Sequence, residues 1–479
     1  MRTGSQADRI LNRARADGAT VCGVGVSNLP LIDFLVGRGI SVTARDRKSR
    51  EDIGDELAAG LESRGVRLVF GEGYLSGICE GVIFRTPGLR PDVPELVGAQ
   101  RRGAILTSEM ELFFELTPAT VIGITGSDGK TTTTTLTYMF LDAQLRRDGL
   151  GRAYVGGNIG EPLLPRVDEM SDDDFAVVEL SSFQLMTMKR SPNRAAITNI
   201  TPNHLDWHRG MDEYAAAKTN IFTHGAARLT VNADNDATRA IGRDAGQVEV
   251  TFFSSGGHRY EDVVPKGRGG SPAIFERDGV IVRSLGGECE ELLAVSDILL
   301  PGRHNVENYM TAIANTYGIV SKDIYRDIAS TFRGVEHRLE LVRKVDGVKY
   351  YNSSIDSSPT RTAAALSALP VKPVVICGGY DKHIPFAPLA EALCERAAGV
   401  VLTGATAGKI AEALDDCPAY SPERLPVERV GDFREAVLAA RRMAEPGGIV
   451  LLSPACASFD RFRNFAERGR VFKEIVNGL

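Results

Sequence analysis

Residues 123–135 read GITGSDGKTTTTT, and this stretch constrains the fold more than any other part of the chain. It overlaps the apolar run ATVIGITG, which predicts a buried strand, and leads into KTTTTTLTYMFLDAQ, whose pattern predicts a helix. A glycine-rich turn between a strand and a helix aims backbone N–H groups at a phosphate. The stretch therefore predicts an α/β fold with a nucleotide site at this turn.

The residues of the turn suit a nucleoside triphosphate. Gly126 and Gly129 allow the backbone to turn tightly, Lys130 offers a cation to the β and γ phosphates, and Thr131 offers a hydroxyl to Mg²⁺. The spacing is not a strict Walker A motif, because Ile124 stands where its first glycine would fall. An accidental glycine-rich turn is the alternative, and the strand and helix on either side disfavour it. We expect the chain to bind ATP.

The composition limits the class of protein. A chain of 479 residues has room for about three domains. Its net charge of −6 argues against broad nucleic-acid binding. The seven cysteines are scattered without a CxxC pair, which predicts reduced thiols and no zinc site. The N-terminal stretch lacks the apolar core of a signal peptide, and no apolar run reaches membrane-spanning length. We therefore expect a cytoplasmic enzyme that does not contact a membrane.

The order of predicted elements indicates three α/β domains in series. Near the N-terminus, the strand ATVCGVGVS, a helix and the strand ISVTARD form a nucleotide-binding βαβ unit that ends at Asp46, although its third glycine is missing. The runs VKYYNSS, KPVVICGG, AGVVLTG and GGIVLLSPA predict parallel strands near the C-terminus. Residues 251–300 are expected to be β-rich or irregular. The predicted domains are a Rossmann-like 1–117, a P-loop ATPase-like 118–335 and a Rossmann-like 336–479.

Four polar residues after the loop are candidates for the chemistry. Glu179 ends the strand AVVEL, where a carboxylate reaches the ligand-binding edge of the sheet, unless it is a helix cap or a partly buried surface acid. His204 follows the strand RAAITNI and could bind a metal or polarise an oxygen, although a lone histidine is more often structural. Asn158 lies in the tight loop GGNIG and could orient a phosphate or a substrate. Lys218, taken alone, would be a solvated lysine.

Two further segments carry side chains that could recognise a ligand or pack. In HNVEN, the side chains of His304, Asn305 and Asn308 fall on one helical face, and amides there could read the edge of a base. Trp207 and His208 are expected to be surface or packing residues.

Taken together, these segments resemble the Mur ligases, the ATP-dependent amide ligases of peptidoglycan precursor synthesis. The matching segments are GITGSDGKT, GGNIG, VVELSSFQL, TPNHLDWH, YAAAK, PGRHNVEN, GVEHRLE, GGYDKHIPF and LLSPACASFDRFRNFAERG, in this order, and only about 235–300 is weakly matched. ELSSFQL and LLSPACASFD…NFAERG are similar to the member that adds D-glutamate to UDP-N-acetylmuramoyl-L-alanine. The resemblance implies that ATP phosphorylates the substrate carboxylate and that the amine of D-glutamate then displaces phosphate.

The resemblance also assigns roles to residues. The implied ATP contacts are Gly126, Ser127, Asp128, Gly129, Lys130, Thr131, Thr132, Asn305, Asn308 and Arg338. The implied ligands of two Mg²⁺ ions are Thr131, Glu179, His204 and a carbamylated Lys218, and the catalytic group comprises Lys130, Glu179, His204 and Lys218. The implied contacts to the UDP substrate are Gly25, Ser27, Asn28, Asp46, Arg47, Thr86 at the head of the Thr86-Pro87-Gly88 turn, Asn158 and Ser181. The implied D-glutamate pocket consists of Lys382, Ser458 and Phe465. The enzyme is expected to be a monomer.

The chain departs from the family pattern at three places. Many members have asparagine at the position of Asp128 and aspartate at that of Asn203. Many also read N-D-S-K where this chain has Asn352-Ser353-Ser354-Ile355. The aspartate missing at Ser353 would help to bind nucleotide, so these departures suggest a variant subtype.

Three other classes of protein remain as alternatives. The first is another ligase on the same scaffold, either a different Mur ligase or a folylpolyglutamate synthetase, although the latter normally lacks the N-terminal domain. The second is a nicotinamide-dependent oxidoreductase that uses the first βαβ unit. The third is a non-catalytic nucleotide-binding regulator.

Overall fold

The computed structural model describes residues 6–25, 28–205, 207–300, 302–382 and 384–479. The chain divides into two compact units. The first contains the described residues up to Asp297 together with Val306–Ile328, and the second contains Ile298–Asn305 and Ala329–Leu479. Within the described ranges, none of the helices combines the length and the apolar character that crossing a membrane requires.

The N-terminal sheet of the first unit is a parallel five-stranded sheet in the order β3-β2-β1-β4-β5. β1 lies in the middle of the sheet, with β2 and β3 on one side and β4 and β5 on the other. This is the arrangement of a nucleotide-binding Rossmann half, as the sequence predicts. The first unit's N-terminal elements are α1 (Gln6–Asp17), β1 (Ala19–Cys22), α2 (Asn28–Val36), β2 (Val42–Asp46), α3 (Arg50–Ile53), α4 (Asp55–Ser63), β3 (Arg67–Phe70), β4 (Val82–Arg85), α5 (Pro94–Arg101), β5 (Ile105–Thr107) and α6 (Glu109–Leu116).

The central sheet has nine strands in the order β14-β13-β12-β11-β10-β9-β6-β8-β7. Its core strands are parallel, whereas β12, β13 and β14 pair antiparallel, which confirms the β-rich prediction for 251–300. The strands are β6 (Thr120–Thr125), β7 (Ala153–Gly157), β8 (Phe175–Glu179), β9 (Arg194–Ile197), β10 (Arg228–Asn232), β11 (Glu249–Ser254), β12 (Ala273–Arg277), β13 (Val280–Leu285) and β14 (Glu288–Ala294).

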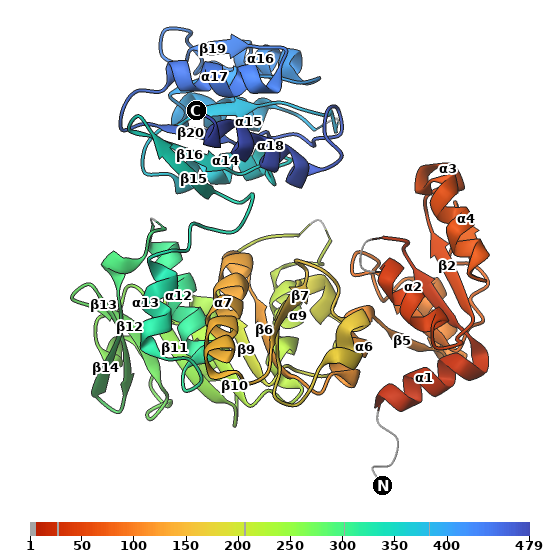
Figure 1. The fold of residues 1–479 in the computed structure, drawn as a ribbon. Helices are drawn as coiled ribbons and strands as arrows, with labels where there is room; N and C mark the ends of the chain where they lie inside the picture. The colour runs from red at the N-terminus through yellow and green to blue at the C-terminus, as the bar shows by residue number, and fades with distance from the viewer. Residues whose placement is uncertain (1–5, 26–27, 206, 301, 383) are drawn as a thin grey trace. The chain divides into compact units, whose positions relative to one another are not determined.

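Helices α7, α12 and α13 lie side by side on one face of this sheet (Figure 1). Their contact is aromatic, since the ring of Phe140 lies 4.8 Å from that of Tyr325 and 6.1 Å from that of Tyr309. The helical elements here are α7 (Lys130–Asp148), η1 (Leu164–Glu169), α8 (Ser182–Leu185), α9 (Met211–Thr223), α10 (Asp236–Arg243), α11 (Tyr260–Val263), η2 (Val295–Asp297), α12 (Arg303–Thr316) and α13 (Lys322–Ala329).

The second unit contains a six-stranded sheet in the order β15-β16-β20-β17-β18-β19, parallel except for β15. All four C-terminal strands that the sequence predicts are present, as β16, β17, β18 and β20. The elements are β15 (Glu340–Val345), β16 (Val348–Asn352), α14 (Pro359–Ala368), β17 (Val374–Cys377), α15 (Ala387–Arg396), β18 (Gly399–Leu402), α16 (Ala407–Asp415), β19 (Val427–Arg429), α17 (Phe433–Met443), β20 (Ile449–Leu452) and α18 (Phe465–Asn477).

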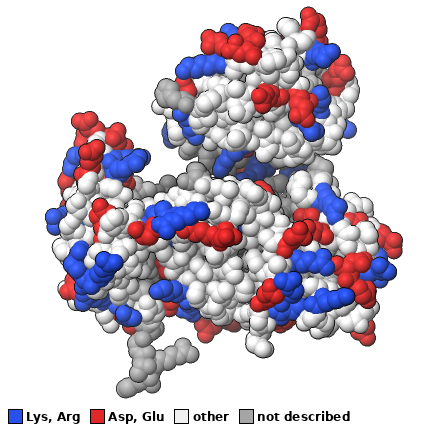
Figure 2. Space-filling view, turned by 180° about the vertical axis from the view of Figure 1, so that it is seen from behind, with Lys and Arg blue, Asp and Glu red and all other residues white. Residues whose placement is uncertain are grey.

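Three mixed or parallel sheets with helices between their strands confirm the predicted three-part α/β architecture. The boundaries near residues 117 and 335 stay predictions, because the two compact units do not divide the first sheet from the second. On the face drawn in Figure 2, basic and acidic side chains are interspersed over the surface.

Candidate active site

The loop between β6 and α7 is built around two glycines, Gly126 and Gly129, where a side chain would be strained. Gly126 has a φ of 152°, and a Cβ added there would lie 1.9 Å from Thr198 Oγ1. Gly129 has a φ of 77°, and a Cβ there would lie 2.4 Å from Asn308 Oδ1. Both positions combine a backbone conformation that favours glycine with close approach of a neighbouring side chain. The loop therefore packs tightly against the residues after β9 and against α12.

Lys130 is the first residue of α7 and closes the loop with its own side chain. Its Nζ donates to the carbonyl oxygens of Gly126 at 3.0 Å and Ser127 at 2.9 Å. The loop is fixed from the other side, since the Ser127 N–H donates to Asn199 O at 2.9 Å and the Asp128 N–H donates to Asn199 Oδ1 at 2.9 Å. A lysine ammonium at a helix N-terminus gives the loop the positive potential that a phosphate requires.

Glu179 lies at the carboxyl end of β8, which pairs with β6 on one side and β7 on the other. Its carboxylate accepts from Thr131 Oγ1 at 2.7 Å and from Asn158 Nδ2 at 2.8 Å, and the residue is 2% exposed. A carboxylate and a hydroxyl oxygen at the phosphate loop are the hard ligands that Mg²⁺ prefers. Glu179 is thus buried beside the phosphate loop, and the alternatives of a helix cap or a partly buried surface acid are wrong.

Lys218 lies on α9 and is buried, not solvated. Its Nζ donates to Gly126 O at 2.7 Å and to Thr125 Oγ1 at 3.4 Å, and it lies 4.6 Å from the centre of the Tyr214 ring. Burial, and next the charge of Lys130, lower the pKa of this amine well below its ordinary value.

His204 lies in the loop after β9, on the same edge of the sheet. Its φ of 55° is left-handed, and its ring packs edge-on against Phe183 at 4.9 Å. Phe183 belongs to α8, which follows β8 and Glu179 in the chain. The ring of His208 stacks on that of Phe183, with 5.6 Å between the ring centres, and its Nε2 lies 2.9 Å from Ser182 Oγ. The packing role expected for His208 is confirmed.

Three of the predicted ligand contacts also have structural roles. Ser181 caps α8, since its Oγ accepts from the Gln184 N–H at 3.3 Å. Asn308 Oδ1 accepts from Thr133 Oγ1 at 3.2 Å beside the phosphate loop. Asn305 lies buried in the first turn of α12. The bonds of Ser181 and Asn308 help to fix the phosphate loop and its surroundings.

In the N-terminal sheet, Asp46 and Asn28 organise the turn after β1. The carboxylate of Asp46 accepts from the Val24 N–H at 2.7 Å, and Asn28 Nδ2 donates to Cys22 O at 3.1 Å and Gly23 O at 2.9 Å. The predicted acid at the end of the second strand therefore reaches the glycine-rich turn.

The remaining N-terminal candidates lie around this turn. Thr86 packs against Gly23, whose added Cβ would lie 3.0 Å from the Thr86 Cβ. Gly25 has open space where a Cβ would project, and Arg47 is exposed. Ser27 lies outside the described residues.

In the second unit, two of the three D-glutamate candidates lie on loops at the carboxyl edge of the sheet. A bridge between Tyr380 and Ala457 brings the loops after β17 and β20 together. These loops carry Lys382, whose Nζ donates to Ser357 Oγ at 3.3 Å, and Ser458, which is buried. Phe465 begins α18, and its ring lies 5.9 Å from that of His337.

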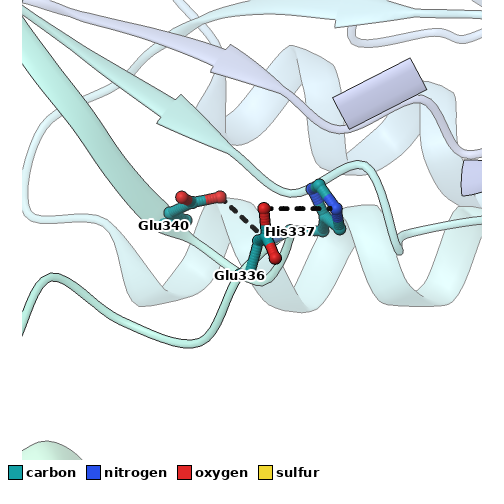
Figure 3. A group of neighbouring side chains, drawn as sticks. All are labelled: Glu336, His337 and Glu340. Atoms are coloured by element: carbon teal, nitrogen blue, oxygen red, sulfur yellow. Dashed lines mark hydrogen bonds and ion pairs between the residues drawn. The ribbon is translucent and has the colours of Figure 1, made fainter. Parts of the chain in front are cut away.

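Figure 3 shows a cluster that the sequence did not predict, formed by Glu336, His337 and Glu340. The cluster has the residue types of a metal site, but a lysine already supplies its positive charge. Lys473 Nζ lies 3.0 Å from Glu336 Oε1 and 2.5 Å from Glu340 Oε1. Glu340 Oε2 also accepts from the His337 N–H and from Asn352 Nδ2, both at 3.0 Å. We interpret the cluster as a lysine-neutralised polar network.

This network holds the backbone around Arg338. His337 and Leu339, on either side of it, have left-handed φ values of 64° and 44°. The Leu339 N–H donates to Ser353 Oγ at 3.1 Å, and the His337 carbonyl accepts from the Ile355 N–H at 3.2 Å. The motif EHRLE marked this segment in the sequence, but nothing in it indicated the distant partners Asn352 and Lys473.

Comparison with known proteins is consistent with this geometry. Residues 124–316 match the model of the Mur ligase middle domain, and residues 337–456 match that of the Mur ligase glutamate ligase domain. The chain is 48% identical over 463 residues to the UDP-N-acetylmuramoylalanine–D-glutamate ligase of Clostridium novyi, covering 96% of each chain. It is 46% identical over 466 residues to the ligase of the same name from Acetivibrio thermocellus, again over 96% of each.

Solved structures share the fold at much lower identity. The UDP-N-acetylmuramate–alanine ligase of Thermotoga maritima has a TM-score of 0.53 at 18% identity, with 96% of this chain and 99% of that chain covered. The UDP-N-acetylmuramoylalanyl-D-glutamyl-2,6-diaminopimelate–D-alanyl-D-alanyl ligase of Acinetobacter baumannii has a TM-score of 0.51 at 16% identity, over 78% and 81% of the two chains.

Proposed function

The chain belongs to the Mur ligase family, and we propose that it joins D-glutamate to UDP-N-acetylmuramoyl-L-alanine at the expense of ATP. The geometric observation that carries the ATP chemistry is the bond between Thr131 of the phosphate loop and the buried carboxylate of Glu179. The identity of the amino acid rests on two relatives, 48% and 46% identical, that are named for this reaction.

The phosphate loop would bind and orient ATP. Backbone N–H groups at the start of α7 and the ammonium of Lys130 neutralise the phosphates, so that two anionic reactants can approach each other. The substrate carboxylate then attacks the γ phosphorus, ADP leaves, and an acyl phosphate forms. The uncharged amine of D-glutamate attacks the acyl carbon and gives up a proton, and phosphate leaves with the bonding electron pair.

The oxygens around Glu179 fit a magnesium ion. Thr131 and Glu179 provide a hydroxyl and a carboxylate that already lie 2.7 Å apart, and Asn158 fixes the second carboxylate oxygen at 2.8 Å. We propose that these residues hold Mg²⁺, with His204 and a modified Lys218 as ligands of a second ion. Bound there, Mg²⁺ would withdraw charge from the phosphoryl oxygens.

Carbamylation of Lys218 is consistent with its surroundings. The reaction joins the uncharged amine to carbon dioxide, forms an N–C bond and releases a proton. Burial lowers the pKa of Lys218, which favours the uncharged amine. The product is an anion among Lys130 and the proposed metal ions, where a lysine ammonium would be repelled.

The remaining contacts would select the two substrates. We propose that the turn organised by Asp46 and Asn28 holds the UDP moiety, and that Lys382 with Ser458 and Phe465 holds D-glutamate. An ammonium and a hydroxyl are suitable partners for a dicarboxylate. We further propose a monomeric enzyme that works in the cytoplasm, where this nucleotide precursor is made.

The test is release of phosphate from ATP and Mg²⁺ with UDP-N-acetylmuramoyl-L-alanine, with D-glutamate, L-glutamate or neither, and with the product identified by mass. We expect release only with D-glutamate. Lys130→Ala should abolish turnover without changing the folded state, whereas Lys322→Ala, a surface change on α13, should not affect it. Turnover with another amino acid alone would keep the mechanism and refute the substrate. Normal turnover by Lys130→Ala would refute the role of the loop.

A further inference from the structure

A second polar pocket lies in the central part of the first unit, away from the phosphate loop. It has a volume of about 230 Å³ and is lined by the strands β9 to β13 and by the end of α12. Arg194, Arg228 and Glu249 are the first residues of β9, β10 and β11, and they lie level with one another in the sheet. The pocket is therefore at the amino ends of these strands.

The phosphate loop lies at the opposite edge. It follows the carboxyl end of β6 and packs on Asn199, just beyond the last residue of β9. A strand of four residues spans roughly 13 Å. The pocket is thus separate from the ATP site, and none of its lining residues takes part in the proposed ligase reaction.

Positive charge dominates the pocket. Its described lining includes three arginines, Arg194, Arg228 and Arg283, and one acid, Glu249. Glu249 bonds to Arg228 at 3.2 Å, so two guanidinium groups have no acid among the lining residues. The nearby Glu290 is itself held by Lys322 at 2.7 Å and by the Tyr317 hydroxyl at 2.6 Å.

The arginines are held in place by neutral partners. Arg194 Nη1 donates to the carbonyl oxygens of Asn315 at 2.7 Å and Tyr317 at 3.4 Å, at the end of α12. The guanidinium of Arg283 lies 4.1 Å from the centre of the Tyr317 ring. These contacts fix the direction of the two guanidinium groups. Glu290, opposite Arg283 on β14, compensates part of the charge of Arg283, and Glu249 part of that of Arg194. Burial, and next the charge of Arg228, lower the pKa of Arg194 to about 10.

The wall of the pocket also holds an unused donor. Asn315 is 1% exposed, and its Oδ1 accepts from Thr230 Oγ1 at 3.1 Å. Its Nδ2 is buried without a hydrogen-bond partner among the described residues. A buried amide donor is rarely left unpaired, and this one belongs to a residue that lines the pocket.

We propose that this pocket is a binding site for a small divalent oxyanion. Guanidinium groups bind phosphate, sulfate and carboxylate oxygens through paired N–H donors. Sites for larger ligands usually enclose about 300–1,000 Å³, so a pocket of about 230 Å³ suits a single small anion, not a nucleotide. The site does not depend on the proposed reaction.

Calorimetric titration of the full chain tests the proposal. Saturating MgADP fills the phosphate loop, and phosphate, sulfate, succinate or chloride is then added. We expect one further site with a dissociation constant below about 1 mM for at least one divalent anion and no binding of chloride. The comparison of the three divalent anions identifies the preferred oxyanion class.

Variants locate the binding. Arg283→Gln should weaken it by about tenfold or more, since it removes a charged donor. Asn315→Asp keeps the shape and should abolish binding by placing a negative charge at the wall. Arg277→Gln is the matched control on the same hairpin, outside the pocket, and should bind as the unmodified chain does. Ligase activity should be unchanged in Arg283→Gln.

Crystals soaked in selenate give an independent readout through anomalous scattering. We expect a peak beside Arg194, Arg283 and Asn315. A dissociation constant above about 1 mM for all three divalent anions, equal binding by Arg283→Gln and the unmodified chain, or a peak only at the phosphate loop would each overturn the proposal.

Discussion

Glu109 begins α6 and is buried, and its carboxyl group makes the stability of the first unit depend on pH. Burial raises its pKa from 4.5 to about 7, and a bond from the Leu164 backbone lowers it only in part. Its Oε1 is buried without a hydrogen-bond partner among the described residues. The folded protein therefore keeps this acid protonated at pH values where the unfolded chain has released the proton.

The size and the sign of the effect follow from linkage. Because the folded state binds the proton more tightly, the contribution is fully present below pH 4.5 and is lost as the pH rises through about 7. The difference between 4.5 and about 7 corresponds to about 3.5 kcal/mol, at about 1.4 kcal/mol for each tenfold change in proton affinity. The charged carboxylate thus destabilises the first unit at pH 8.

Glu109→Gln removes the ionisable group and keeps the shape. We expect the variant to be more stable than the unmodified chain by about 1–3 kcal/mol at pH 8, because the buried unpaired amide of glutamine offsets part of the gain. Near pH 4.5 the gain should be gone, and only the cost of the amide should remain. Urea unfolding at several pH values measures this. The chain has one tryptophan, Trp207, in the same unit as Glu109, so its fluorescence reports this unit.

Glu115→Gln is the matched control on the same helix. Glu115 is partly exposed and pairs with Arg190 at 3.1 Å, so its removal should cost less than about 1 kcal/mol at every pH. A stability difference between Glu109→Gln and the unmodified chain that does not change between pH 5 and pH 8 would refute the reasoning. A Glu109→Gln protein that is less stable at pH 8 than at pH 5, relative to the unmodified chain, would do the same.

Two further predictions concern the phosphate loop. Gly126→Ala should abolish MgADP binding in calorimetry, because the new Cβ would lie 1.9 Å from Thr198 Oγ1. The control Gly149→Ala lies at a helix end with open space, so it should bind MgADP normally and lose about 1 kcal/mol of stability. Equal binding by both variants would contradict the loop geometry. After equilibration with ¹³C-bicarbonate, the protein should show a carbamate carbon resonance by NMR that Lys218→Met lacks and Lys189→Met retains, and identical spectra would rule out the carbamate.

The parts of the fold that repeat along the chain could be predicted from the sequence. Apolar runs that alternate with helical patterns predicted the parallel strands of all three sheets, because a strand covered on both faces must be apolar throughout. Gly126 and Gly129 were predictable because a tight turn between a strand and a helix requires residues without a Cβ. Glu179 was predictable because a polar residue that ends a buried strand faces the ligand-binding edge.

Contacts between distant segments could not be predicted in this way. The sequence pattern of α9 gives no sign that Lys218 points into the loop, because its burial depends on Gly126, 92 positions earlier. The bonds of Lys473 to Glu336 and Glu340 join residues that are 137 and 133 positions apart. Nothing in the sequence singled out Asn315, because only the neighbouring strands make it part of a pocket.

Ser353, which stands where many members of the family have aspartate, still contributes to the structure around Arg338. The hydroxyl of Ser353 accepts from the Leu339 N–H at 3.1 Å and so supports the left-handed backbone next to Arg338. Three residues later, Asp356 is buried and accepts from Ser453 Oγ at 2.8 Å. Burial raises the pKa of Asp356, while bonds from Ser353 and Ser453 and the charge of Arg338 act to lower it. A carboxylate therefore still lies within electrostatic reach of Arg338, although the motif position itself has lost one. Asp356 thus places an acid near Arg338, and the Ser353 hydroxyl stabilises the segment that carries the arginine.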